Sequence, residues 1–418
     1  MAPVYAGGVL KRIGYVLVLI VGVVLGHVVT RYYDDTYRRA PQTAQAPGEK
    51  APAESAKPAA TPEPVRANVN FEREPLWAYG FVDPPKPGDK AQPQAPPTNK
   101  PRPNQDLTEQ TRPRQVDGSA ASYSLVQIRD LHNVIDWFPT DHPTMTPIIQ
   151  HGPVSQGEIG RGCGGCHLPN GRGRPENAPP SGLPVAYFVR QIEDFRHGLR
   201  YTADPRKPNT NTMIDLAKAM SDAEIKEAAE YFASVKPVEH WIRVVESPTS
   251  PKVRYVGNLA QTAKEGGKPT GMEPIAGRII ELSEDEEQNE TLRNPHSGWV
   301  AYVPPGSVKK GEDLVTTGGM RIVGGKIVQG KTTACGTCHG LNLTGVVGAD
   351  VPPIAGRSPS YIVRQLWDIQ QGTRNGSQAQ LMKLVVAKLT SEDLIAIASY
   401  VASRPQNAPQ TAAPAATD

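Results

Sequence analysis

All four cysteines of this 418-residue chain lie in two C-x-x-C-H motifs, Cys163-Gly-Gly-Cys166-His167 and Cys335-Gly-Thr-Cys338-His339. C-x-x-C-H is the pattern of c-type haem attachment. Two thiols about one helical turn apart can reach the two vinyl groups of one haem, and the adjacent histidine then points a ring nitrogen at the iron. We therefore expect two covalently bound haem c groups, with His167 and His339 as iron ligands.

Other chemistries for these cysteines fit less of the sequence. A single motif is also compatible with a zinc half-site or a redox dithiol, and two half-sites could combine into one four-thiolate zinc site. That arrangement leaves both histidines unexplained. Four cysteines are too few for a disulfide scaffold of this length, and a net charge of +3 excludes a strongly basic nucleic-acid-binding protein.

An internal repeat places one motif in each of two modules. The segment that begins at Tyr187 (YFVRQI) returns 174 positions later at Tyr361 (YIVRQL), and the segment from Met213 returns 169 positions later at Met382. We expect two homologous haem modules, the first over residues 121–240 and the second over residues 306–405.

Met213 and Met382 occupy the same position in the two modules. Each stands before an amphipathic segment that opens with a Ser or Thr cap and early acidic residues, as helices do. We expect these methionines to be the sixth ligands of the two irons; His197 competes for the first iron but is replaced by Gln371 in the second module. A His/Met pair leaves no free coordination site, which favours electron transfer over catalysis.

The N-terminal part of the chain predicts a membrane anchor and a tether. An apolar run over residues 13–30 follows Lys11-Arg12 and is long enough to cross a bilayer. We expect an uncleaved single-pass anchor with residues 1–12 in the cytoplasm; a cleaved signal peptide is the alternative. Residues 31–120 are rich in Pro and Ala, which predicts a disordered tether, and residues 406–418 a disordered tail.

Two further segments stand apart from this plan. Phe71, Trp77, Tyr79 and Phe81 form an aromatic island in the predicted tether, either a strap packed on the anchored domain or a docking motif for a partner. Residues 241–305 carry several short alternating runs that predict a small β-rich insertion between the modules. A hairpin is expected over residues 320–329, because two apolar runs are joined there by Gly324-Gly325.

The two modules resemble a two-haem class I cytochrome c of the c-four type, which implies a mainly α fold with two tandem class I cytochrome c domains and the small β insertion between them. In the second module the resemblance rests on Cys335 to His339, Pro353-Ile354-Ala355-Gly356, Tyr361, Gln365-Leu366 and Met382. The first module departs from the pattern, with His167-Leu168-Pro169 after its cysteines and Pro180-Ser181-Gly182 in place of Ile-Ala-Gly.

The resemblance also implies partners for the haems. In this family a proline carbonyl after the motif accepts a hydrogen bond from the ligand histidine, which implies Pro353 in the second module and Pro179 in the first. Tyr187 and Tyr361 occupy matching positions near the haems. Arg190 and Arg364, and also Arg357, are candidates for contact with haem propionates; ordinary surface arginines are the alternative.

A member of this family is an electron carrier, and its haems are attached outside the bacterial cytoplasmic membrane. The resemblance therefore implies periplasmic modules on the inner membrane, redox proteins such as a respiratory complex, dehydrogenase or oxidase as partners, and no small-molecule substrate. Two alternatives stay open. The chain could be the dedicated cytochrome subunit of a larger dehydrogenase with residues 241–305 as its docking surface, or a dihaem enzyme of the peroxidase or thiosulfate dehydrogenase type.

Overall fold

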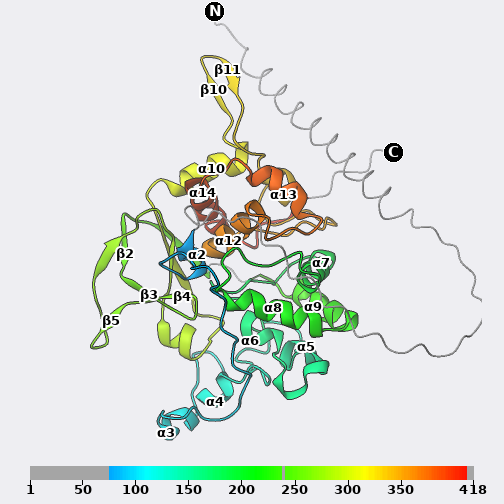
Figure 1. Cartoon of the computed structure of the whole chain (residues 1–418), viewed down its shortest axis with the longest axis vertical. Coiled ribbons are helices and arrows are strands. Elements are labelled where there is room, and N and C mark those ends of the chain that lie inside the picture. The colour runs from blue at the N-terminus through cyan, green and yellow to red at the C-terminus, as the bar shows by residue number, and fades with distance from the viewer. Residues whose placement is uncertain (1–74, 238–240, 412–418) are drawn as a thin grey trace, which may run out of the picture. The chain divides into compact units, whose positions relative to one another are not determined.

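The computed structural model of the chain describes residues 75–237 and 241–411, which contain two helical modules and a β-rich insertion (Figure 1). The predicted cytoplasmic segment, the anchor at 13–30, the first part of the tether and Phe71 lie outside these residues. Within them, no helix has the length and apolar character needed to cross a membrane. All described residues belong to one compact unit, Glu63–Asp418.

The first module is built from short helices around a core of its own. Helix α9 starts with a capping box, in which Ser221 and Glu224 bond each other's backbone N–H groups, and it buries Ile225 and Phe232. Phe188 and Ile192 of α7 pack into the same core. The helices of this module are α4 (Leu125–Ile128), α5 (Pro147–Gln150), η2 (Val154–Ile159), α6 (Cys163–His167), α7 (Val185–Arg196), α8 (Pro208–Ala219) and α9 (Asp222–Ser234).

The second module repeats this arrangement with a tighter helix pair. Gly311 of α10 lies against the carbonyl of Ala396 in α14 so closely that a Cβ at this position would overlap it. Helix α14 begins with a capping box made by Thr390 and Asp393, and almost all of its residues are buried. The helices of this module are α10 (Ser307–Thr317), α11 (Gly336–His339), α12 (Pro359–Gln370), α13 (Ala379–Val386) and α14 (Ser391–Ala402).

The insertion, residues 241–305, shares its core with the second module. Its largest sheet has the order β1-β9-β8, with β1 parallel to β9. Trp241 and Trp299 are buried in the core of the second module, and the Trp241 indole donates to the Gly356 carbonyl over 3.1 Å. The elements are β1 (Ile242–Glu246), β2 (Thr249–Pro251), β3 (Val253–Val256), β4 (Leu259–Thr262), β5 (Lys264–Glu265), β6 (Lys268–Pro269), β7 (Met272–Pro274), β8 (Ile280–Ser283), the π-helix η3 (Glu287–Thr291) and β9 (Trp299–Val303).

A two-stranded hairpin forms around the Gly324-Gly325 turn, as the sequence predicts. Strands β10 (Arg321–Val323) and β11 (Lys326–Val328) pair antiparallel, and both turn glycines have positive φ. The hairpin projects away from α10 (Figure 1), and Ile322 and Ile327 on it are 75% and 72% exposed.

The prediction of a disordered tether does not hold for residues 75–120, here called the strap, because this segment packs against the rest of the molecule. Helix α2 (Leu76–Tyr79) lies in the core of the second module, where Tyr79 is fully buried and its hydroxyl donates to Asp368 over 2.7 Å. Trp77 and Phe81 pack against the same core, so these three members of the aromatic island serve a structural contact.

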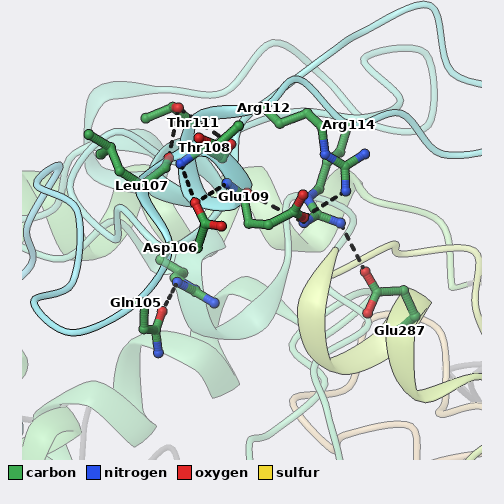
Figure 2. A network of polar contacts seen from close by, with 10 residues as sticks. Gln105, Asp106, Leu107, Thr108, Glu109, Thr111, Arg112, Arg114 and Glu287 are labelled. Atoms are coloured by element: carbon green, nitrogen blue, oxygen red, sulfur yellow. Dashed lines mark hydrogen bonds and ion pairs between the residues drawn. The ribbon is translucent and has the colours of Figure 1, made fainter.

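The strap is also fastened to the first module, where the Ala91 amide donates to the Pro205 carbonyl over 2.9 Å, and to the insertion. Asp106 caps helix α3 (Leu107–Thr111) by accepting from the Thr108 amide over 2.7 Å. Figure 2 shows Arg114, just after α3, contacting Glu109 of that helix at 2.9 Å and Glu287 of the insertion at 3.4 Å. Specific polar contacts therefore hold a segment whose composition alone predicts disorder.

Candidate haem sites

The first C-x-x-C-H motif forms helix α6, whose glycines allow it to lie against neighbouring backbone. A Cβ at Gly162 would overlap the Gln150 carbonyl, and Gly164 and Gly165 are buried beside Val134 and Leu131. His167 Nδ1 lies 2.7 Å from the Ala178 carbonyl oxygen. Because a carbonyl can only accept, Nδ1 carries the proton and Nε2 keeps its lone pair for a metal.

Met213 and the first motif line one cavity. Its volume, including its open mouth, is about 1300 Å³. Its lining includes Cys163, Cys166 and His167 of the motif and Met213 of α8. Apolar side chains from α7 and α9 complete it. The residue types, an imidazole and a thioether with two thiols in a largely apolar pocket, fit a haem held by thioethers and His/Met ligation.

The second motif repeats the histidine geometry. His339 Nδ1 lies 2.8 Å from the Pro352 carbonyl oxygen, so its Nε2 is also available to a metal. Met382 of α13 and Cys335 are both partly buried against the core of this module. Cys338 is exposed, as are Leu341 and Leu384, which leaves this site more open than the first.

The carbonyl that each histidine uses differs from the expected one by one residue. The expectation was Pro179 and Pro353; the structure has Ala178 and Pro352. The two proline carbonyls accept instead from Arg357, whose Nε is 2.6 Å from the Pro353 oxygen and whose guanidinium also donates to Pro179. One arginine therefore ties together the loops that orient both histidines.

Burial sets the protonation states at both motifs. It lowers the pKa of His167 and His339, so both imidazoles are neutral, as iron ligands must be. It raises the pKa of Cys163 and Cys335 to about 12. Dithiol redox chemistry uses thiolates, and a raised thiol pKa disfavours it.

Matching residues of the two modules meet across an approximately two-fold interface. Arg200 donates to Gln365 over 2.8 Å, and Arg374 donates to Gln191 over the same distance. Arg200 and Arg374 also form an antiparallel β-bridge. Arg374 donates to the Tyr187 hydroxyl over 2.7 Å. Tyr187 would have its pKa raised by burial, but the charges of Arg374 and Arg200 lower it.

The other predicted site residues fall into two groups. Tyr361 and Arg364 belong to the second module but line the cavity of the first. The Arg364 guanidinium is buried and already donates to the carbonyls of Ala78 and Pro175, both over 2.6 Å. Arg190 instead forms an ion pair with Asp350 at 3.0 Å, which links the two modules at the surface.

Sequence reasoning missed two charged residues in the first cavity, Lys207 and Glu176. Both line it, and both are less than a tenth exposed. The segment that contains Lys207 has no equivalent of the same length in the second module, because thirteen positions separate Arg200 from Met213, whereas eight separate Arg374 from Met382. No repeat or motif in the sequence marks them.

Comparisons with known proteins give sequence relatives among the dihaem cytochromes. No protein-family model matches the chain. It is 30% identical to "Cytochrome c4" of Stutzerimonas stutzeri over 169 residues, covering 37% of this chain and 77% of that protein. It is 29% identical to "Cytochrome c4" of Azotobacter vinelandii over 246 residues, covering 57% and 82%. It is 31% identical to "Thiosulfate dehydrogenase electron acceptor" of Stutzerimonas stutzeri strain A1501 over 243 residues, covering 58% and 78%.

Solved structures give a weaker likeness. The thiosulfate dehydrogenase TsdBA of Marichromatium purpuratum has a TM-score of 0.38 and 24% identity, with 60% of this chain and 38% of that chain covered. Reduced recombinant cytochrome c4 from Pseudomonas stutzeri has a TM-score of 0.35 and 22% identity, with 58% and 93% covered. On the sequence relationship, a 30% identity that spans 77% of the relative, the chain belongs to the cytochrome c4 family of dihaem, electron-carrying class I cytochromes c.

Proposed function

We propose that the chain binds two covalent haem c groups and passes single electrons through them between redox proteins. The first haem would be held by Cys163, Cys166, His167 and Met213, and the second by Cys335, Cys338, His339 and Met382. The observation that carries the proposal is the cavity shared by the first motif and Met213, with Nε2 of His167 left free by its Nδ1 bond. A haem supplies a one-electron couple, and His/Met ligation raises its potential.

The ligand sets favour a carrier over an enzyme. A methionine stands at the same repeat position in each module, so both irons would be six-coordinate with no exchangeable site. The interface between the modules supports transfer within the molecule, because residues of the second module, Tyr361 and Arg364, line the first cavity. A peroxidase or a dehydrogenase would need one iron with an open or replaceable ligand.

The location that we propose is the periplasmic face of a bacterial inner membrane. Residues 13–30 would anchor the chain, with residues 1–12 in the cytoplasm. Haem attachment outside the cytoplasmic membrane would place residues 75–411 in the periplasm. The segment between the anchor and the strap, residues 31–74, would then be the tether. Partition of the full-length chain into a membrane fraction, and release after deletion of residues 1–30, test this topology.

Spectroscopy of the purified full-length protein tests the function. We expect two haems per chain, low-spin spectra in both redox states, and a sulfur-to-iron charge-transfer band in the oxidised form. Stopped-flow mixing with a soluble cytochrome partner should show rapid electron exchange without substrate turnover. A high-spin fraction, or turnover of peroxide or thiosulfate by the protein alone, contradicts the carrier.

A second role shares this chemistry but fixes the partner. Two relatives are named thiosulfate dehydrogenase electron acceptors, one of them 31% identical to this chain. The chain would then take electrons from a sulfur-compound dehydrogenase, with the insertion as a docking surface. Reduction of the oxidised protein by thiosulfate only when a thiosulfate dehydrogenase is present supports this role. An unchanged reduction rate after deletion of residues 249–274, which run from β2 to β7, shows that this part of the insertion is not the docking surface.

A further inference from the structure

Lys207 is a buried cation with no partner. It stands at the N-cap of α8, its side chain is 3% exposed, and its Nζ makes no hydrogen bond within residues 75–237 and 241–411. The side chain lines the cavity that contains the first motif and Met213. An unpaired ammonium group in such a place costs several kcal/mol, and burial accordingly lowers the pKa of Lys207, so an anion bound in this cavity would stabilise its charged form.

The acidic groups near Lys207 are committed to other partners. Asp204 is paired with Arg206 at 2.6 Å. Asp368 accepts from the Tyr79 hydroxyl over 2.7 Å and from the Ala203 amide over 2.9 Å. Glu176 lies 3.4 Å from Arg174 through one oxygen, while its second oxygen is buried without a partner. Glu176 is therefore the one rival counter-ion among the described neighbours.

The other cations of this cavity already have acceptors. Arg364 donates to two backbone carbonyls, and Arg200 donates to Gln191 and Gln365. Arg161 donates to the Ala95 carbonyl. Among the described basic side chains that line the cavity, Lys207 is the one with all three of its donor protons unassigned.

We propose that Lys207 binds a propionate carboxylate of the haem in the first module and raises the reduction potential of that haem. The inference rests on the proposed function, because the carboxylate belongs to the cofactor. A positive charge close to a haem favours the reduced state, which carries one positive charge less. The second module has no residue at the corresponding place, so the effect is confined to one of the two haems.

The test uses the full-length dihaem protein and resolves the two potentials by spectroelectrochemical titration. Lys207→Met should shift one potential downward and leave the other unchanged. Lys207→Arg keeps the charge and should restore the shifted potential. Lys218→Met is the matched control, because Lys218 lies on the same helix but is exposed, and it should move neither potential.

The pH dependence separates an ion pair from a packing role. In Lys207→Met the buried propionate loses its counter-ion, so the shifted potential should rise again as the pH falls and the propionate is protonated. The parent protein should show a flatter profile over the same range. Lys207→Met could lose the first haem altogether. In that case, a first haem that is bound in Lys207→Arg but not in Lys207→Gln supports the ion pair. A first haem that is bound in neither variant overturns it.

Two results overturn the proposal and leave the electron carrier intact. In the first, Lys207→Met leaves both potentials unchanged, and the double variant Lys207→Met/Glu176→Gln fully recovers any stability that Lys207→Met loses. This result assigns Lys207 to Glu176 as its counter-ion. The other is a parent protein that lacks one sulfur-to-iron band and regains it in Lys207→Met, which places the lysine on the iron. Failure of the proposed function gives different results, because the parent protein would then bind no haem, show a high-spin fraction or turn over peroxide or thiosulfate by itself.

Discussion

The guanidinium of Arg374 in the second module donates to the Tyr187 hydroxyl of the first module over 2.7 Å and to Gln191 of the same helix over 2.8 Å. Both acceptors lie next to the cavity of the first motif, and both are buried. The packing of the second module therefore determines part of the polar environment of the first site.

Removal of this arginine should uncouple the modules. Arg374→Ala leaves the buried Tyr187 hydroxyl without its donor, whereas Gln191 keeps its bond from Arg200, and we expect a loss of about 1–3 kcal/mol in the free energy of unfolding. Urea denaturation at pH 7 measures it. Arg243→Ala is the control, since Arg243 is 61% exposed in its ion pair with Glu284 and should change stability by less than about 0.5 kcal/mol. Equal losses of unfolding free energy in Arg374→Ala and Arg243→Ala would mean that the contacts of Arg374 between the modules do not stabilise the fold.

The methionines can be tested one at a time. Met213→Ala and Met382→Ala should each remove about half of the sulfur-to-iron band and lower one reduction potential, because each deletes one of two equivalent ligands. Met220→Leu is the control: it lies in the core of the first module, and the repeat has Leu389 at its place. A full-strength band in Met213→Ala would assign that site to another ligand.

The acid stability of the second module should depend on Asp393. Burial would raise its pKa, but hydrogen bonds led by Lys331 at 2.8 Å lower it to about 2. The folded pKa is below the unfolded value of about 3.9, so this contribution is complete above pH 4 and is lost as the pH falls toward 2. Both lysine partners are half exposed, so we expect about 1–2 kcal/mol.

The pH profile of unfolding measures this contribution. Asp393→Asn should lose the stability at pH 7 and show a smaller further loss between pH 4 and pH 2 than the parent protein. Glu392→Gln is the matched control, because Glu392 is the neighbouring acid and its side chain is 85% exposed. Parallel profiles for the parent and Asp393→Asn would contradict the depressed pKa.

The strap should stabilise the second module through Tyr79. Tyr79→Phe keeps the buried ring but removes the donor to Asp368, and we expect a loss of about 1–2 kcal/mol. Tyr302→Phe is the control, since the Tyr302 hydroxyl makes no hydrogen bond within the described part of the chain. Faster proteolysis within residues 75–120 in Tyr79→Phe, and not in Tyr302→Phe, would localise the effect to the strap.

The local features of the fold were accessible from sequence. The motifs, the repeat and the capped helices α9 and α14 depend on residues a few positions apart, and the Gly-Gly turn specifies the β10–β11 hairpin in the same way. The resemblance to c-four cytochromes rests on these short-range patterns, and the sequence relatives confirm the family.

The long-range features were not accessible. The order of the strap depends on Asp368, which is 289 positions from Tyr79 in the sequence. The prediction of the histidine acceptors was wrong by one residue, at Pro179 and Pro353, for a similar reason. Arg357, which lies between the two loops, donates to both proline carbonyls. Lys207 escaped notice because its burial depends on residues from both modules and its segment is absent from the repeat.

Arg357 also constrains how this protein can evolve. It bonds Pro353 in its own module and Pro179 and Ser181 in the other, next to the carbonyls that orient both histidines. A duplicated domain is ordinarily free to diverge or to be lost once its twin suffices. Here a substitution at one position alters both haem loops together, and deletion of either copy removes bonds that hold the loop of the other, so selection acts on the two halves as one heritable unit.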